Sequence, residues 1–329
     1  MKIHSLVDSN AAESLNEQVL NSAFQIKYLH WHQQMAAEMD LLTLNCNDLN
    51  KGLNHPKACL LTHTLAMFGI NQVDTVITQK TQFKLNINHL LNDIAQAKVY
   101  QKSLKINLIG PLELLCLMKI EDSTKAAVLE KLVPLYQQLL TELNSADVDW
   151  IQLQESVLTG SDDNQQLEYE QQLIKVCQAL STVERPKLIL KSSFIQTLIE
   201  EGRKARLDNL LPILSLEGIQ INASHKNFNW SLLLTLVSQI KVISVAVVQG
   251  GVTQKTNLAD LLRQIQPIYD ELMDNLWLTT EFSAERNLFN GQKLTELNLL
   301  KSALIDYEID PVIAYSNTAL VPYRTQLQA

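Results

Sequence analysis

Several polar side chains stand at the ends of short apolar runs, where they could bind or protonate a ligand. Glu155 follows the run VDWIQL, Lys191 ends the run KLILK, and Glu281 lies near the end of LWLTTEF. An α/β barrel builds its active site from side chains at the carboxyl ends of its strands. A carboxylate there can act in general acid-base catalysis when its surroundings shift its pKa. The candidate ligand-binding residues are Gln154, Glu155, Lys191, Asn222, Gln249 and Glu281.

Glu155 has two interpretations. If Glu155 and Lys191 project into one barrel mouth, they can neutralise each other as an ion pair, and we favour this interpretation over catalysis. The amides of Gln154, Asn222 and Gln249 favour hydrogen bonding to a polar ligand over proton transfer. We therefore assign no catalytic residue.

A glycine pair follows the seventh apolar run, at Gln249, Gly250 and Gly251. Barrels often bind phosphate at this place, on loop amides at a helix amino terminus. Two adjacent glycines also suit a tight βα turn, and we favour this interpretation. Lys255 is the only nearby basic group that would attract an anion.

Eight β-rich apolar runs alternate with helical patterns. The expected strands cover residues 39–44, 73–79, 105–110, 148–153, 187–192, 218–223, 242–248 and 276–282. Apolar residues at three- and four-residue spacings predict helices over residues 128–146, 167–183, 257–274 and 293–309. Strands that alternate with helices pair in parallel, because a parallel strand needs a crossover connection. The pattern predicts a single (β/α)8 TIM barrel with parallel strands, and a doubly wound open sheet is the alternative.

The expected organisation is an amino-terminal segment over residues 1–24, the barrel over 25–310 and an extended carboxyl-terminal tail over 311–329. With 27 Lys and Arg against 35 Asp and Glu, the net charge of −8 argues against a nucleic-acid or anionic-membrane partner. The amino terminus has no signal-peptide pattern. The most apolar window, residues 232–248, contains polar residues that favour a helix followed by a buried strand over a membrane span. We expect a cytoplasmic protein.

Six segments together resemble the amino-terminal domain of cobalamin-independent methionine synthase, a 5-methyltetrahydropteroyltriglutamate–homocysteine methyltransferase. They are HWHQQMAAEMDLL (30–42), QFKL (82–85), LIGPLELLCLMKI (108–120), VPLYQQLLTELNSADVDWIQLQESVL (133–158), NLADLLRQIQPI (257–268) and LWLTTEF (276–282). The resemblance implies a barrel that, in the family, faces a second barrel carrying the zinc that activates homocysteine. The first barrel helps to hold the folate methyl donor.

The chain departs from the family at several strand ends. The family's Ile-Asp-Glu-Pro-Ala-Leu is here the segment 153–158, in which Gln154 replaces the acid and Ser156 replaces the proline. The usual His-Val-Asp becomes Gln220, Ile221 and Asn222, and the Gly-Arg-Asn after the seventh strand is lost. The amino-terminal Phe-Pro-Arg segment of the folate site has no counterpart in residues 1–20. These changes predict a divergent standalone copy that is eroded at its folate positions.

The zinc ligands of the family's catalytic barrel are a His-x-Cys pair, a Glu and a distant Cys, and this chain has no His-x-Cys. His30 and His32 would point to different faces of a helix. His225 has no neighbouring Cys, and His55 and His63 flank Cys59 at a spacing not typical of a metal site. The four cysteines, Cys46, Cys59, Cys116 and Cys177, form no CxxC motif and are expected to be reduced and mostly buried.

We therefore expect no metal and no cofactor on this chain. The favoured hypothesis is a catalytically degenerate binding or accessory protein in methionine or one-carbon metabolism, whose ligand is a small polar molecule such as a folate or an amino acid. The alternative is a methyltransferase subunit that a separate zinc-bearing barrel chain completes. Divergence toward an unrelated small-molecule binder is a third hypothesis. The sequence by itself does not decide between a binding protein and an enzyme.

Overall fold

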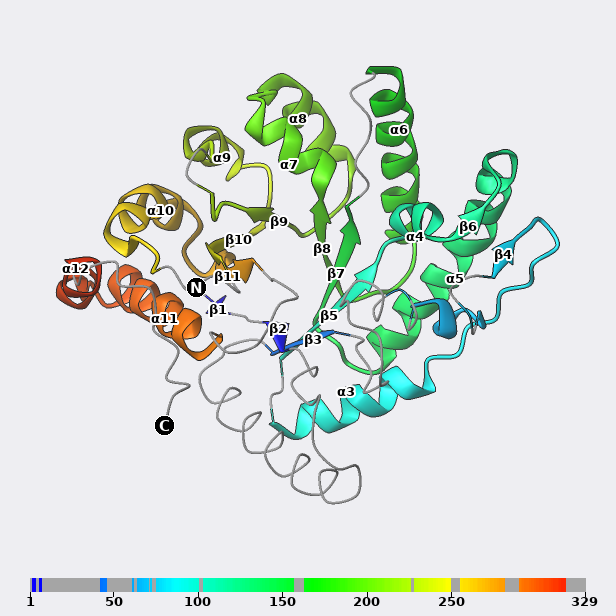
Figure 1. Ribbon diagram of the computed structural model, residues 1–329, viewed down its shortest axis with the longest axis horizontal. Coiled ribbons are helices and arrows are strands. Elements are labelled where there is room, and N and C mark those ends of the chain that lie inside the picture. The colour runs from blue at the N-terminus through cyan, green and yellow to red at the C-terminus, as the bar shows by residue number, and fades with distance from the viewer. Residues whose placement is uncertain are drawn as a thin grey trace, which may run out of the picture.

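The computed structural model describes residues 2–3, 6–7, 42–45, 61, 64–70, 72, 75–100, 103–156, 163–225, 228–249, 255–281 and 290–317. Within these residues the chain forms parallel strands that alternate with helices. Figure 1 shows the helices in an arc around the outside of the strands. The alternation predicted from the apolar runs is confirmed.

The main sheet, in the described part of the chain, has the strand order β1-β11-β10-β9-β8-β7-β5-β3-β2. Its six long strands form a parallel half-barrel: β5 (Leu104–Ile109), β7 (Trp150–Glu155), β8 (Lys187–Ser192), β9 (Gly218–Asn222), β10 (Val242–Gln249) and β11 (Leu276–Glu281). Shorter strands extend both edges: β1 (Lys2–Ile3), β2 (Leu6–Val7) and β3 (Leu42–Asn45). All their pairings are parallel.

One expected strand is not part of the main sheet, and two strands lie in a segment for which no strand was predicted. The run expected over residues 73–79 contributes only β4 (Val76–Ile77), which pairs with β6 (Lys119–Ile120) in a separate two-stranded sheet. In the amino-terminal segment, β1 pairs with β11 and β2 pairs with β3. Both amino-terminal strands are two residues long, too short to produce an alternating pattern, so their place in the sheet depends on contacts with distant strands.

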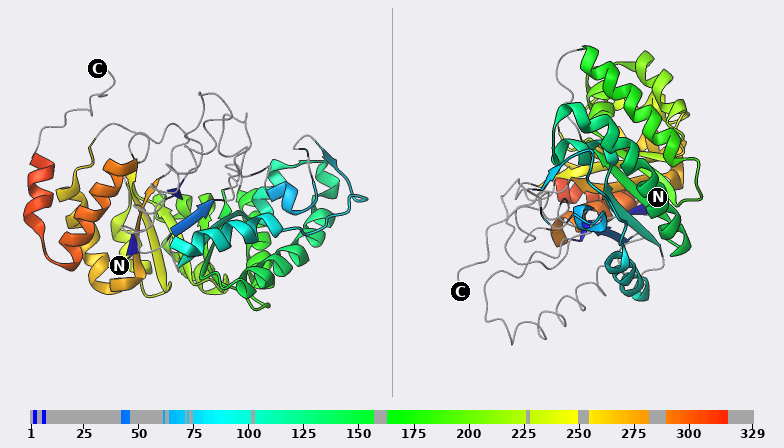
Figure 2. Two further views of the ribbon diagram at one scale, coloured as in Figure 1. Left: turned by 90° about the horizontal axis from the view of Figure 1, so that it is seen from below. Right: turned by 90° about the vertical axis from the view of Figure 1, so that its right-hand side faces the viewer.

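The helices cover the outer face of the sheet (Figures 1 and 2). They are α3 (Asn88–Tyr100), α4 (Pro111–Leu117), α5 (Lys125–Ser145), α6 (Asp163–Leu180), α7 (Ser193–Glu200), α8 (Lys204–Leu210), α9 (Trp230–Leu236), α10 (Leu258–Leu272), α11 (Asn290–Ile305) and α12 (Ile309–Asn317). The helices predicted before the fourth, fifth and eighth strands and after the last strand are confirmed. Short 3-10 turns lie at Asp122–Thr124, Leu211–Ile213 and Met273–Asn275. The expected extended tail instead begins as the helix α12.

Helix α5 shows why the periodic sequence packs on the sheet. Its buried residues include Val128, Leu132, Tyr136, Leu139 and Leu143, which recur every three or four positions along one side. Burying a large apolar side chain stabilises the fold by about 1.5–3 kcal/mol. The apolar residues of the helices and the helix-facing side of the strands thus form one continuous core.

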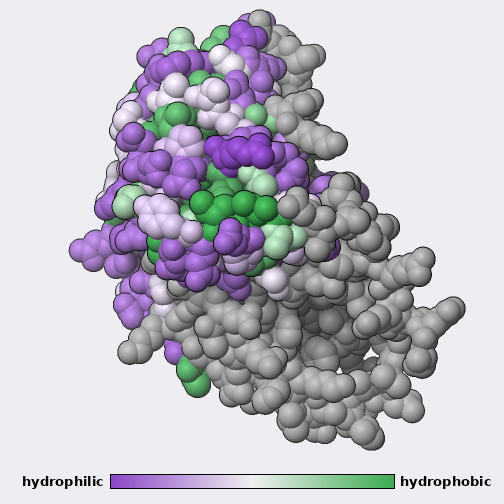
Figure 3. All heavy atoms as spheres, turned by 90° about the vertical axis from the view of Figure 1, so that its left-hand side faces the viewer, coloured by the Kyte–Doolittle hydropathy of each residue, from purple (hydrophilic) through white to green (hydrophobic). Residues whose placement is uncertain are grey.

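The face of the molecule that carries α12 is mainly hydrophilic and includes a limited apolar area (Figure 3). Exposed apolar side chains near the start of α12 are Ile305, Tyr307, Ile309 and Ile313. No helix in the described part of the chain combines the length and the apolar composition that crossing a membrane requires.

Candidate functional site

The concave face of the half-barrel has an apolar base. Trp150, Ile189, Val242 and Trp277 form a buried cluster of their own, separate from the core beneath the helices. The two tryptophan rings meet edge to face with their centroids 4.6 Å apart. Successive strand residues point to opposite faces. Side chains two residues further along each strand therefore also lie on the concave face, one step closer to the carboxyl ends.

The next step toward the carboxyl ends is polar instead of apolar. Its buried side chains are Gln152, Gln220, Ser244 and Thr279, and Lys191 is half-buried at the same step of β8. From β5, the buried side chain of Lys105 reaches this layer and donates a 2.6 Å hydrogen bond to Gln152 Oε1. Barrel interiors are usually filled by branched apolar residues, so a polar layer here is unusual.

The two lysines on the concave face interact electrostatically. Burial lowers the pKa of the Lys105 ammonium well below its ordinary value, and the positive charge of Lys191 lowers this pKa further. Lys191 is aligned with Gln154 on one side and with Gln220 on the other. The layer is therefore a polar region with positive charge and hydrogen-bonding amides.

Four of the predicted candidates lie at the rim of this face or on the strands that form it. Gln154 and Asn222 are half-buried, and Gln249 is exposed at the end of β10. Glu281 is the last residue of β11, where its backbone is aligned with Gln249. The strands thus bring Gln154, Lys191 and Asn222 to one concave face, as predicted. Gly250 and Gly251 of the expected phosphate-type turn lie outside the described residues.

Glu155 does not point into the mouth, which corrects the expectation of an ion pair with Lys191. It shares the helix-facing side of β7 with Ile151 and Leu153, and it is 1% exposed. Its carboxyl oxygens accept hydrogen bonds from the backbone N–H groups of Leu112 at 3.1 Å and Glu113 at 2.6 Å.

Glu155 thereby satisfies two N–H groups in the first turn of α4, which have no partner within a helix. Gly110, the residue before α4, has no side-chain cap of its own.

A second carboxyl group reciprocates this arrangement. Glu113 is also buried, and its Oε2 accepts a 2.9 Å hydrogen bond from the Ser156 backbone N–H. Burial raises the pKa of Glu155 to about 8, although its two backbone hydrogen bonds favour the charged form, and the nearby Glu113 also raises it. Glu155 and Glu113 together hold the end of β7 against the start of α4. The sequence had instead predicted that Glu155 faces a ligand.

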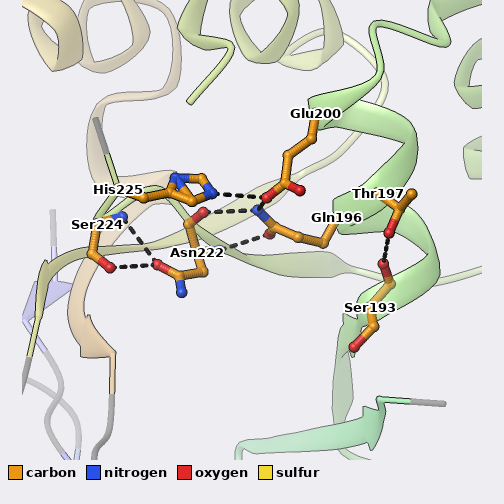
Figure 4. Close-up of polar contacts among 7 residues, drawn as sticks. All are labelled: Ser193, Gln196, Thr197, Glu200, Asn222, Ser224 and His225. Carbon is orange, nitrogen blue, oxygen red and sulfur yellow. Dashed lines mark hydrogen bonds and ion pairs between the residues drawn. The ribbon is translucent and has the colours of Figure 1, made fainter. Parts of the chain in front are cut away.

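A polar cluster at the rim was missed by the sequence analysis (Figure 4). Gln196 on α7 accepts a 2.9 Å hydrogen bond from the Asn222 backbone N–H and donates a 2.8 Å bond to the Asn222 carbonyl. Gln196 also donates to Glu200, whose Oε1 lies 2.8 Å from His225 Nε2. The Asn222 side-chain oxygen accepts from both the backbone and the hydroxyl of Ser224. This network fixes the end of β9 and the orientation of Asn222.

The described residues contain no group of three or more His, Cys, Asp or Glu that could hold a metal ion. His225 pairs with Glu200. Cys177 is buried and Cys116 is exposed, and both are free thiols. The remaining residues of the metal hypothesis lie outside the described ranges: His30, His32, Cys46, His55, Cys59 and His63.

Two kinds of sequence comparison indicate the same protein family. The family described as "Cobalamin-independent synthase, N-terminal domain" matches residues 74–273, more than half of the chain. A 5-methyltetrahydropteroyltriglutamate–homocysteine methyltransferase of Saccharophagus degradans is 28% identical over 249 residues, which cover 69% of this chain and 31% of the relative. The corresponding enzyme of Neisseria meningitidis is 25% identical and covers 68% of this chain and 31% of its own length. The chain thus spans about a third of these relatives.

Solved structures show the same fold. A B12-independent methionine synthase from Shewanella sp. W3-18-1, in complex with selenomethionine, superposes with a TM-score of 0.61 at 11% identity and covers 90% of this chain and 91% of that one. A second such synthase, from Listeria monocytogenes and described as putative, gives a TM-score of 0.57 at 13% identity, with 86% of each chain covered. Because the family match covers residues 74–273, more than half of the chain, this chain belongs to the family of the amino-terminal domain of cobalamin-independent methionine synthase.

Proposed function

We propose that this chain is a binding or accessory barrel in methionine or one-carbon metabolism, without methyl-transfer catalysis of its own. The observation that carries the proposal is the polar layer of the concave face. Its side chains are lysines, amides and hydroxyls, which hold a ligand through hydrogen bonds and charge. Glu155, which was expected to face this mouth as a ligand-binding candidate, instead binds the backbone of α4.

The ligand contacts in this proposal are Gln154, Lys191 and Asn222 at the rim, with Gln249 and Glu281 at the ends of the next two strands. Glu155 contributes indirectly, by fixing α4 against β7. The ligand is a small polar molecule such as a folate or an amino acid, and the protein works in the cytoplasm. The same proposal includes a complete eight-stranded barrel, in which the short strands β1 and β2 connect the two edges of the half-barrel. Pairing of β1 with β11 and of β2 with β3 supports this closure.

The alternative proposal is a methyltransferase subunit that a separate zinc-bearing barrel chain completes. The family match supports it, because the curated relatives that share this domain are methyltransferases. In this case the polar face would hold part of the methyl donor while the partner supplies the metal.

Ligand-dependent thermal stability tests the binding proposal. A ligand that binds only the native state raises the apparent stability. We expect a folate, homocysteine or methionine to raise the melting temperature of the full chain, and we expect Lys191→Gln to reduce that rise. No stabilisation by any of the three would contradict the role in this metabolism.

A methyl-transfer assay separates the two proposals. The chain alone, supplied with methyltetrahydrofolate, homocysteine and zinc, should form no methionine above a control without protein. Turnover by the chain alone would contradict the non-catalytic role. Turnover that appears only when a purified zinc-bearing barrel chain is added would establish the subunit role instead.

A further inference from the structure

Two lysines share the buried polar layer of the concave face. The Lys105 ammonium is buried and donates to Gln152, while Lys191 is half-buried on β8 and acts electrostatically on Lys105. Like charges repel more strongly in a protein interior than in water. An anion that contacts both ammonium groups would remove this repulsion, so the arrangement suits a negatively charged ligand.

Gln220 provides an independent observation in the same layer. Its backbone is aligned with Lys191, and its side chain is 6% exposed. Among the residues that the structure describes, none forms a hydrogen bond with the Gln220 Oε1 atom. Buried polar atoms in native proteins almost always have a partner, and each exception requires an explanation. A ligand that brings a hydrogen-bond donor to Gln220 Oε1 would supply the missing partner.

We propose that the concave face binds a small oxyanion that also carries a hydrogen-bond donor. In this site Lys105 and Lys191 contact the anionic group, and Gln220 Oε1 accepts the ligand's donor. The inference rests on the proposed role as a binding barrel and names the chemical class of its ligand. A hydroxycarboxylate and hydrogen phosphate are the simplest molecules with both features.

The polar layer lies next to partly exposed side chains at the carboxyl ends of the strands. Lys191 is only half-buried, and the rim residues next to it, Gln154 and Asn222, are also partly exposed. Beneath the polar layer, the Trp150 and Trp277 rings form the apolar base. A ligand entering from the rim would therefore meet Lys191 first and stop above the tryptophans, which limits it to a small molecule.

Isothermal titration calorimetry of the full chain tests the proposal with four probes at constant ionic strength: glycolate, acetate, inorganic phosphate and chloride. Glycolate and acetate differ in the hydroxyl donor alone. We expect saturable binding of glycolate or phosphate, weaker binding of acetate and none of chloride. Whichever of glycolate and phosphate binds more tightly identifies the ligand class as a carboxylate or a phosphate. No saturable binding of either would overturn the proposal.

Three variants assign the binding to these residues. Lys191→Gln should weaken glycolate and phosphate by roughly tenfold to 150-fold, the equivalent of one charge-assisted hydrogen bond. Gln220→Leu should weaken glycolate and leave acetate unchanged, because only glycolate brings a donor. Lys187→Gln is the matched control, since Lys187 lies at the other end of the same strand with its ammonium over the Trp150 ring. Equal binding by the Lys191 and Lys187 variants would refute the site.

Failure of this inference is distinguishable from failure of the proposed function. If folate, homocysteine or methionine stabilises the chain and neither Lys191→Gln nor Gln220→Leu changes small-anion binding, the inference fails and the metabolic role stands. If small anions bind in the predicted variant-dependent way and none of the three metabolites stabilises the chain, the site stands and the metabolic role fails. Near-ultraviolet circular dichroism of the tryptophans confirms that each variant is folded.

Discussion

Replacing Glu155 with Gln tests whether this carboxyl group is structural. The wild-type group accepts one hydrogen bond on each oxygen, from Leu112 N–H at 3.1 Å and Glu113 N–H at 2.6 Å. At pH 6 the carboxyl group is protonated, but its hydroxyl oxygen can still accept a hydrogen bond, whereas a glutamine keeps one acceptor and turns the other atom into a donor that faces a backbone N–H. Leaving a buried donor unsatisfied costs about 1–3 kcal/mol. With the added repulsion between the two donors, we expect Glu155→Gln to lower the free energy of unfolding by roughly 2–3 kcal/mol at pH 6.

The pH dependence of this loss follows from the raised pKa. Glu155 has a pKa of about 8 in the folded protein, above the ordinary value of 4.5, so the folded state binds the proton more tightly than the unfolded state. Its contribution to stability is therefore fully present below pH 4.5 and is lost as the pH rises through 8. The wild-type protein should lose stability between pH 5 and pH 9 relative to Glu155→Gln, and the difference between the two should shrink toward pH 9.

Urea unfolding at pH 6, 7.5 and 9, followed by tryptophan fluorescence, measures this difference. Glu168→Gln is the matched control, because Glu168 is exposed on α6 and, within the described part of the chain, accepts a hydrogen bond from Gln172 alone. We expect that control to stay within about 0.5 kcal/mol of the wild type at each pH. A Glu155→Gln loss no larger than that of the control would refute the structural role. A loss that grows as the pH rises would refute the raised pKa.

Three further predictions concern stability in the same region and at the base of the barrel. Gly110→Ala should lower the free energy of unfolding by about 1–3 kcal/mol in urea titrations, because a Cβ at this position would stand 2.2 Å from Glu155 Oε1; an unchanged midpoint would contradict this close approach. Tyr136→Phe should cost about 1 kcal/mol by the same measurement, because it removes a buried 2.7 Å bond to the Ile109 carbonyl, and no loss at all would show that this bond is dispensable. Trp277→Ala should cost about 3–5 kcal/mol and lower the melting temperature, because it empties the base of the concave face; a loss below 1 kcal/mol would mean that the strands close over the space.

The periodic elements could be read from the sequence because their pattern is local. Apolar residues at three- and four-residue spacings predicted α5, α6, α10 and α11, and the apolar runs predicted the six long strands. The order of these elements then predicted parallel pairing, because crossover helices permit no other simple arrangement. The family could also be identified, since the segment 133–158 combines a helix, a strand and a strand end.

The sequence alone also placed Gln154, Lys191 and Asn222 correctly at the carboxyl ends of the strands. It did not reveal the polar layer beneath them. Lys105, Gln152 and Gln220 occupy alternate positions within otherwise apolar strands, and that alternation was the available signal. Its meaning depends on which face of each strand is concave.

Tertiary structure decided the role of Glu155 and the place of the first strand. Along β7, Glu155 shares a face with Ile151 and Leu153, opposite Gln152 and Gln154, but the strand alone does not show which of the two faces meets the helices. Only packing put Glu155 on the helix side, where the N–H groups of α4 bind it. For β1 and β2, two residues each, the pairing with β11 and β3 is a long-range contact that no local pattern encodes. The sequence by itself therefore determined the alternation of parallel strands with helices and the family, and the tertiary structure decided which polar groups lie on the concave face and which support the fold.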